Sequence, residues 1–200
     1  MKKLWYALLI LLFVACNNDP RKATTIDREK NKMEQNDSVP LFSPAVAAWV
    51  NANLKTAHTT LALEERWQDD SLQQEPFQLT QSFAQNYKTV LRWSPDSNYI
   101  LDIGSYGAVV EKNNDGEVDL QYGEPDTEVA LIDTKKSLRT RLFYVGPSAE
   151  IKDGMWLNNT ELMVLGTFKS DVGVIDTLSW KVDLQSNFFA LYNIKAIKGK

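Results

Sequence analysis

The chain has 200 residues, of which 44% are hydrophobic and 24% charged, and its formal net charge is −4. An acidic protein has no general attraction for nucleic-acid phosphates or anionic lipid headgroups, so we expect no nucleic-acid partner. One cysteine and one histidine exclude an intrachain disulfide, a multi-cysteine metal site and a histidine-rich metal site.

The first fifteen residues have the layout of a secretory signal peptide. Lys2 and Lys3 give a positive start, and residues 4–15 form an uninterrupted apolar stretch. This stretch matches the apolar region of a signal peptide, which has about 7–15 residues, and it is shorter than the roughly 20 residues of a transmembrane helix.

The only cysteine follows immediately. Val14-Ala15-Cys16 resembles the lipobox of bacterial lipoproteins of the Bacteroidetes type, with Phe13 where that family usually has leucine. The resemblance implies a signal peptide at residues 1–15 and acylation of Cys16 by fatty acids such as palmitate. One acyl chain anchors only marginally, at about 0.8 kcal/mol per buried CH₂, whereas two or three chains hold a protein on a membrane. We therefore expect a lipid-anchored protein of the bacterial cell envelope, with the outer membrane favoured.

Residues 16–40 predict a flexible tether after the lipidated cysteine. They are polar and charged, so they cannot bury enough apolar surface to offset the entropy of ordering. Extended, they would reach on the order of 80 Å at about 3.3 Å per residue. Within the tether, Asp37-Ser38-Val39 resembles a short O-glycosylation acceptor motif of Bacteroidetes. Loss of Lys2 and Lys3 with the leader leaves 20 basic and 26 acidic residues and a net charge of −6.

Residues 41–200 predict a single globular domain, since this length suits one well-buried core and is short for two. We expect its first part, 41–87, to be of mixed helical character. Ser43 is a plausible N-cap with Pro44 at the first helical position. Leu61–Trp67 is interpreted as a second helix, and residues 78–87 are ambiguous. The apolar stripe of the first helix consists of Val46, Trp49, Val50 and Leu54.

Residues 88–200 are predicted to be rich in β-strands. Short runs of β-branched and aromatic residues alternate here with polar turns, and no helix-sized apolar pattern interrupts them. The expected strands cover 89–93, 99–103, 128–132 and 138–145, and the turns cover 94–98, 113–116 and 146–147.

The C-terminal half also contains a possible internal repeat. Four segments recur in constant order: 93–101 as 156–164, 104–105 as 166–167, 118–121 as 182–185 and 130–131 as 190–191. The first segment, together with 128–134, resembles blades of WD40-like propellers of the TolB type. Propellers close with about four to eight blades, whereas this chain has room for two. The expected fold is therefore mainly β (α+β), with N-terminal helices packed on antiparallel sheets built from two blade-like repeats.

No catalytic, cofactor or metal site is expected. His58 lies in a polar run and is interpreted as a surface residue. Asp102 is the most notable acid, because it lies within an apolar strand. It is either buried or on the solvent-exposed face of the strand together with Ile100. The adjacent pairs Glu64-Glu65 and Asp69-Asp70 have diverging side chains and are interpreted as solvated charge. Residues 113–119 lack the ligand spacing of a calcium loop and predict a hairpin turn.

Trp93 and Trp156, the tryptophans of the possible repeat, are candidates for either core or binding aromatics. The sequence favours a membrane-anchored, non-enzymatic binding or scaffolding protein whose partner is another envelope protein, a peptide or a glycan. The alternative is an envelope hydrolase that uses carboxylates such as Asp102.

Overall fold

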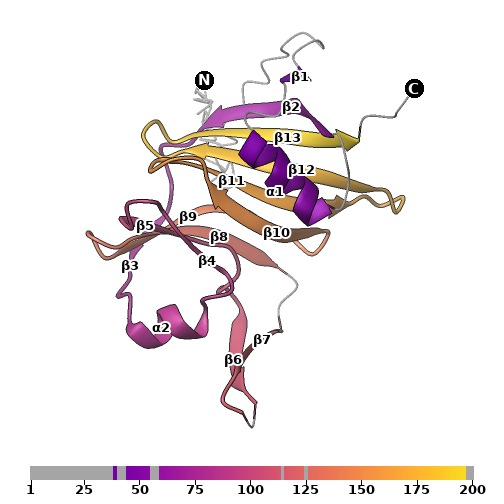
Figure 1. The fold of residues 1–200 in the computed structure, drawn as a ribbon. Helices are drawn as coiled ribbons and strands as arrows, with labels where there is room; N and C mark the ends of the chain where they lie inside the picture. Colours follow the sequence, from indigo (N-terminus) through magenta and orange to yellow (C-terminus); the bar gives the residue numbers. More distant parts are fainter. Residues whose placement is uncertain (1–37, 40–43, 55–58, 114, 124–125, 197–200) are drawn as a thin grey trace, which may run out of the picture.

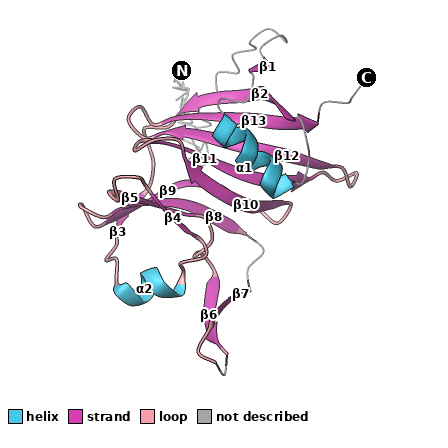
Figure 2. Cartoon of the chain, in the orientation of Figure 1, coloured by secondary structure: helices cyan, strands magenta, loops and turns pink. Residues whose placement is uncertain are grey.

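The structure is a computed structural model that describes residues 38–39, 44–54, 59–113, 115–123 and 126–196. Two antiparallel β-sheets pack face to face, and a helix lies on the outer face of each (Figures 1 and 2). The prediction of a mainly β fold with antiparallel sheets is confirmed. The expected signal peptide, Cys16, the expected N-cap Ser43 and His58 lie outside the described residues, as does the expected tether apart from Ser38–Val39.

The C-terminal sheet has six strands in the order β1-β2-β13-β12-β11-β10. The last four strands along the chain form an antiparallel meander, and β2 adds to its far edge beside β13. Strand β1 pairs with the middle of β2, so the last residues of the expected tether take part in the sheet. The strands are β1 (Ser38–Val39), β2 (Thr59–Gln68), β10 (Ala149–Trp156), β11 (Glu161–Lys169), β12 (Ile175–Asp183) and β13 (Phe188–Ala196).

The central sheet has five strands in the order β3-β9-β8-β5-β4. It too is a four-stranded meander with a short strand, β3, added beside its last member. The chain leaves this sheet between β5 and β8 to form the separate hairpin of β6 (Ala108–Lys112) and β7 (Val118–Tyr122). The sheet strands are β3 (Gln74–Pro76), β4 (Leu91–Trp93), β5 (Tyr99–Asp102), β8 (Thr127–Asp133) and β9 (Leu138–Val145).

The main hydrophobic core fills the space between the two sheets. Alternate residues of facing strands point inward, as with Val129 and Leu131 of β8 and Leu162 and Val164 of β11. Stacked aromatic pairs join the layers within this core, with ring centroids 5.1 Å apart for Phe143 and Trp180. Each fully buried aliphatic side chain contributes about 1.5–3 kcal/mol relative to exposure, so this layer dominates the stability of the fold.

The two helices cover the outer faces. Helix α1 (Pro44–Leu54) places Val46 and Val50 on the C-terminal sheet, where they are buried against Met163 and Leu165. Helix α2 (Gln81–Asn86) is capped at its N-terminus by Thr80, whose hydroxyl accepts a hydrogen bond from the backbone N–H of Phe83 at 3.1 Å. The apolar residues on the outer face of the central sheet are covered by side chains in and around this helix. The covered residues are Leu91, Ile100 and Ile132, and the covering residues are Phe77, Leu79, Phe83 and Tyr87. Neither helix of the described chain has the length and apolar character to cross a bilayer.

The expected helix at Leu61–Trp67 is wrong, because this segment lies within strand β2. The pairing of β2 with β13 shifts at Glu64, which has no partner on the neighbouring strand. Because of this bulge, the apolar side chains before Glu64 and those after it face opposite sides of the sheet. Leu61 and Leu63 lie beneath α1, whereas Trp67 stacks on Phe189 in the core between the sheets. Broken alternation of this kind is easily mistaken for helical spacing. The described part of residues 41–87 therefore contains two strands as well as two helices.

The matched segments of the possible repeat agree only in part with the strand order. Trp93 and Trp156 each end a strand before a tight turn, and they pair with Ile100 and Leu162 on the returning strands. The later segments lie in non-equivalent places: 118–121 is in the separate hairpin and 182–185 at the end of β12, while 130–131 is in β8 and 190–191 in β13. Equivalent positions in two blades would also bury both tryptophans to a similar extent, but Trp93 is 47% exposed.

A half-buried carboxylate joins α1 to both sheets. Asp153 of β10 accepts hydrogen bonds from Trp49 Nε1 at 2.7 Å, from Arg92 Nη2 at 2.8 Å and from the Gly154 N–H at 2.8 Å. Burial by itself would raise the pKa of Asp153, but these hydrogen bonds and the charge of Arg92 together hold the pKa below its ordinary value. The carboxylate therefore stays ionised and connects the edges of the two sheets.

Candidate functional site

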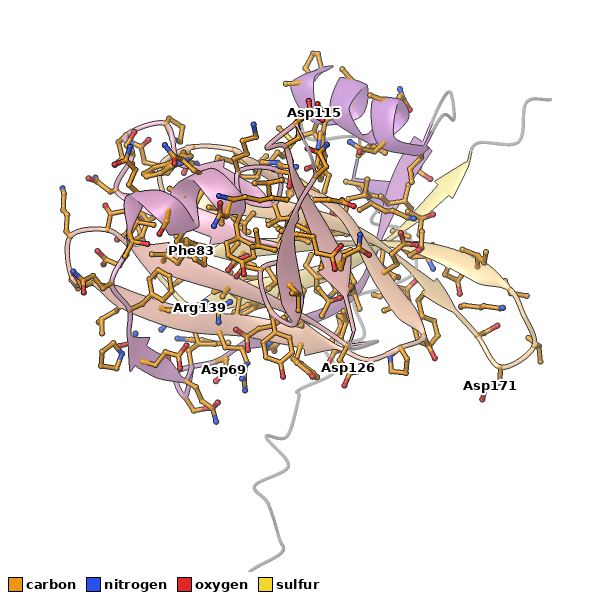
Figure 3. The ribbon with its side chains drawn as sticks, turned by 90° about the horizontal axis from the view of Figure 1, so that it is seen from below. Asp69, Phe83, Asp115, Asp126, Arg139 and Asp171 are labelled. Atoms are coloured by element: carbon orange, nitrogen blue, oxygen red, sulfur yellow. The ribbon has the colours of Figure 1, made fainter. Side chains whose placement is uncertain are left out.

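The outer face of the central sheet has an apolar part and a polar part. Helix α2 covers the apolar part, and Phe83 marks it in Figure 3. Arg139 lies on the same face, beside the helix-covered region (Figure 3). The polar part consists of Asp102 from β5, Glu128 from β8, and Arg139 and Arg141 from β9.

Local strand geometry places these four charges together. Ala130 of β8 is the partner of Asp102 on one side and of Arg141 on the other, so the three strands align here. The pairing of β8 with β9 shifts after Arg141, where Leu142 is the extra residue. Because of this bulge, Arg141 faces outward while Leu142 and Phe143 both contact the core.

The four charges form one connected ion-pair network. Arg139 Nη2 donates to Asp102 Oδ2 at 3.0 Å, and Arg139 Nη1 donates to Glu128 Oε1. Arg141 Nε donates to the other oxygen of Glu128 at 2.5 Å, and Arg141 Nη1 donates to Gln73 Oε1 at 3.0 Å. Arg139 thus bridges the two acids, and Arg141 carries the network outward to the segment that leads into β3.

Three members of the network are withdrawn from water. Asp102 is 0% exposed, Glu128 is 1% exposed and Arg139 is 9% exposed. Burial by itself would lower the pKa of Arg139, but the charges and hydrogen bonds of Asp102 and Glu128 outweigh this effect and raise the pKa above its ordinary value. A buried charge is tolerated when it is paired and hydrogen-bonded, so each of these groups depends on the others.

Asp102 also fixes the backbone where the chain leaves β5. Its Oδ1 accepts hydrogen bonds from the N–H groups of Gly104 at 3.2 Å and Ser105 at 2.9 Å, and its Oδ2 accepts one from the Ser105 hydroxyl. Of the two sequence-based alternatives, Asp102 shares the outer face with Ile100, yet both are buried. Its oxygens are fully engaged in positioning the chain and Arg139.

A cavity of about 310 Å³ opens beside this network. Glu128 and Arg139 lie at its inner side, and Gln74 and Glu75 are exposed. Glu75 Oε1 is 3.8 Å from Arg139 Nη1, close enough for a weak ion pair. Six polar or charged residues line the cavity: Gln73, Gln74, Glu75, Glu128, Arg139 and Arg141.

A pair of tyrosines lies next to Arg141, one of the residues that line the cavity. The guanidinium carbon of Arg141 lies 5.8 Å from the ring centroid of Tyr144, which packs edge-on against Tyr106 at 5.6 Å. The rings remain accessible, at 45% for Tyr144 and 36% for Tyr106. Hydrogen bonding to Tyr106, together with desolvation and the Asp126 carboxylate, raises the pKa of Tyr144, so its hydroxyl stays protonated at neutral pH. The site is therefore a polar cavity beside an exposed aromatic pair.

The sequence-based aromatic candidates lie elsewhere. Trp156 is half-buried at the junction of the sheets, where its Nε1 donates to the Arg92 carbonyl at 2.7 Å and its ring stacks on Tyr99 at 6.3 Å. Trp93 is exposed at the end of the edge strand β4. Neither lines the cavity. Trp156 therefore has a packing role, and Trp93 remains a solvent-facing aromatic.

The remaining acids of interest do not form a site. Asp69 accepts hydrogen bonds from the N–H and hydroxyl of Ser71, as expected for a turn. Asn113 Oδ1 accepts the N–H groups of Asp115 and Glu117, so the predicted hairpin turn between β6 and β7 is confirmed. Among the described residues there is no group of three histidine, cysteine or acidic side chains that could hold a metal ion.

Sequence reasoning missed Glu128, Arg139 and Arg141. A signal was present, because Glu128 opens an apolar strand and the two arginines alternate within the next one. Opposite charges on the same face of neighbouring strands stabilise one another, so this pattern favours cross-strand ion pairs. Comparisons of the chain with protein-family models, with curated proteins and with solved structures found no match.

Proposed function

We propose that this protein is a lipid-anchored, non-enzymatic binding protein of the bacterial cell envelope. The leader and the lone Cys16 support the anchor, and residues 16–37 are long enough to extend the domain away from the lipid. Its partner is another envelope component: a protein, a peptide or a glycan. The polar cavity and the adjoining Tyr106 and Tyr144 are the binding surface.

One observation carries the binding role. A cavity lined by polar groups lies next to two accessible aromatic rings, and its inner charges are already paired with one another. Binding sites commonly combine aromatic contact area with a few fixed polar groups that set orientation. Because the network holds Arg139 and Glu128 in place before a ligand arrives, little side-chain entropy is lost on binding.

The alternative is a carboxylate-dependent hydrolase. The observation in its favour is that two carboxylates, Asp102 and Glu128, lie close together because both accept hydrogen bonds from Arg139. General acid catalysis requires a carboxyl that can contact the substrate, whereas both of these acids accept hydrogen bonds from arginine side chains. Glycosidase carboxyls also flank an open space, whereas the Arg139 guanidinium stands between these two. The hydrolase reading predicts that Glu128→Gln abolishes turnover of an envelope polysaccharide while the protein stays folded.

We further propose that the two meanders, β4-β5-β8-β9 and β10-β11-β12-β13, are diverged copies of one blade-like unit. Support comes from their shared strand order, from the added strand beside the last member of each, and from Trp93 and Trp156 at matched strand ends. An experimental structure should allow the four strands of one meander to be superposed on the other in chain order. Superposition of only the first two strands would refute common origin.

The anchor and the binding surface are tested separately. Cys16→Ser should move the protein from the membrane fraction to the soluble fraction, because no other side chain can take the thioether-linked lipid. Unchanged partition into detergent would contradict the anchor. Purification of the lipidated protein from solubilised envelopes should recover a partner with the wild type and with the control Phe168→Ala, which alters a similarly exposed ring on β11. Recovery should fail with Tyr144→Ala, and equal recovery would contradict the proposed surface.

A further inference from the structure

We infer that the cavity beside Arg139 and Arg141 binds a neutral saccharide. This inference rests on the proposed binding role and names the chemical class of its ligand. It follows from three properties of the site: its balance of charge, the kind of hydrogen-bonding groups it offers, and the aromatic rings at its edge.

The charge balance disfavours an anionic ligand. Two guanidinium groups line the cavity, and so do two carboxylates, Glu75 and Glu128. Behind the lining, Asp102 adds a third carboxylate to the same network. The site therefore has no net positive charge. A phosphate or carboxylate ligand would have to compete with buried acids for arginines that are already paired, and a separated buried acid is costly.

The lining instead offers planar groups with several donors and acceptors. Gln74 makes no side-chain hydrogen bond within the described chain, and Nη2 of Arg141 has no partner among the described residues. Glu75 is exposed and supplies acceptors. Amide, guanidinium and carboxylate groups can each form two parallel hydrogen bonds. Neighbouring sugar hydroxyls, which both donate and accept, present a matching pair of atoms without a charge.

The exposed rings supply the apolar half of such a site. A sugar ring has polar edges and a face of C–H groups, and that face packs on an aromatic ring. Tyr144 offers an accessible ring next to Arg141, and Tyr106 supports it edge-on. The volume of about 310 Å³ is at the lower end of the range of about 300–1,000 Å³ for small-ligand sites, which suits a short segment of a glycan rather than a folded partner.

The test uses the full-length lipidated protein in detergent and a panel of defined oligosaccharides. Maltohexaose, cellohexaose, mannohexaose and chitohexaose are the neutral probes, and hexagalacturonic acid is the anionic comparison. Saturation-transfer NMR and calorimetry should detect at least one neutral probe with a millimolar or tighter Kd. The anionic probe should bind at least tenfold more weakly. No binding of any neutral probe, or tighter binding of the anionic probe, would overturn the inference.

Variants place the binding on this surface. Tyr144→Ala should weaken the affinity for the bound probe by about five- to tenfold, the worth of one aromatic contact, while Tyr144→Phe should retain most of it. Gln74→Ala should also weaken binding without changing stability, since Gln74 is exposed and makes no side-chain hydrogen bond in the described chain. Phe168→Ala is the control and should bind as the wild type does. Binding that survives both Tyr144→Ala and Gln74→Ala would also overturn the inference.

These results separate the ligand class from the broader role. Failure of all saccharides, with an envelope partner still captured through Tyr144, would refute the saccharide and leave the proposed binding function in place. A second outcome is that both variants, Tyr144→Ala and Gln74→Ala, still capture the envelope partner but bind the saccharide more weakly than the wild type. This outcome would support the saccharide and contradict a protein partner at this surface.

Discussion

Replacement of Arg139 by methionine tests the ion-pair network most severely. Methionine keeps much of the side-chain volume but removes the charge that Asp102 and Glu128 share. Because both acids are completely buried, they would be left without their common partner. Breaking a buried ion pair from one side costs about 3–5 kcal/mol, a large part of the 5–15 kcal/mol that stabilises a typical domain. Glu128 retains Arg141, so the lower end of this range is expected.

Urea unfolding followed by tryptophan fluorescence measures this loss. With a urea dependence of about 2 kcal/mol per molar, a loss of 3 kcal/mol lowers the midpoint by about 1.5 M. The triple variant Arg139→Met, Asp102→Asn, Glu128→Gln removes all three buried charges and should recover part of the loss. An Arg139→Met variant within 1 kcal/mol of the wild type would refute the buried network.

Two further substitutions test the junction between the sheets. Asp153→Asn should lower the free energy of unfolding by about 1–3 kcal/mol at pH 7. Because the folded-state pKa of Asp153 is depressed, the charge-dependent part of its contribution is present above its unfolded value of about 3.9 and is lost as the pH falls below that value. The difference between the two proteins in urea melts should therefore narrow at pH 3, and a constant difference would contradict this role. Gly154→Ala should cost about 1–3 kcal/mol, because a Cβ at this position would lie 2.6 Å from Leu101 Cδ2 in the core. Gly123→Ala is its control, since a Cβ there meets no atom within 4 Å, and equal melting temperatures for the two variants would count against the close packing.

The strands of the central sheet could be predicted from local sequence. Runs such as 99–103 and 128–132 combine β-branched residues with flanking turn residues, and the structure places strands at 99–102 and 127–133. The helix from Pro44 was equally readable, because the proline at its first position and its apolar stripe are local features. These signals need no knowledge of what each element packs against.

The errors arose where distant partners decide the structure. Strand β2 pairs with β13, more than a hundred residues later, and the bulge at Glu64 hides its alternation. The site was missed for the same reason. Asp102 could be singled out because it lies in an apolar run, but Glu128 and Arg139 are ordinary charged residues in sequence. Only the pairing of β5, β8 and β9 brings the three together. Neither the pairing nor the cavity beside it can be derived from residue spacing alone.

Site-specific photocrosslinking in living cells tests the proposed binding surface most directly. A benzophenone side chain, which reacts with C–H bonds of proteins and glycans alike, would replace Tyr144 in one variant and Phe168 in another. We predict a crosslinked envelope adduct from position 144 and none from position 168, although the two native rings are similarly exposed. Adducts from position 168 alone, or equal adducts from both positions, would contradict a binding surface on the outer face of the central sheet.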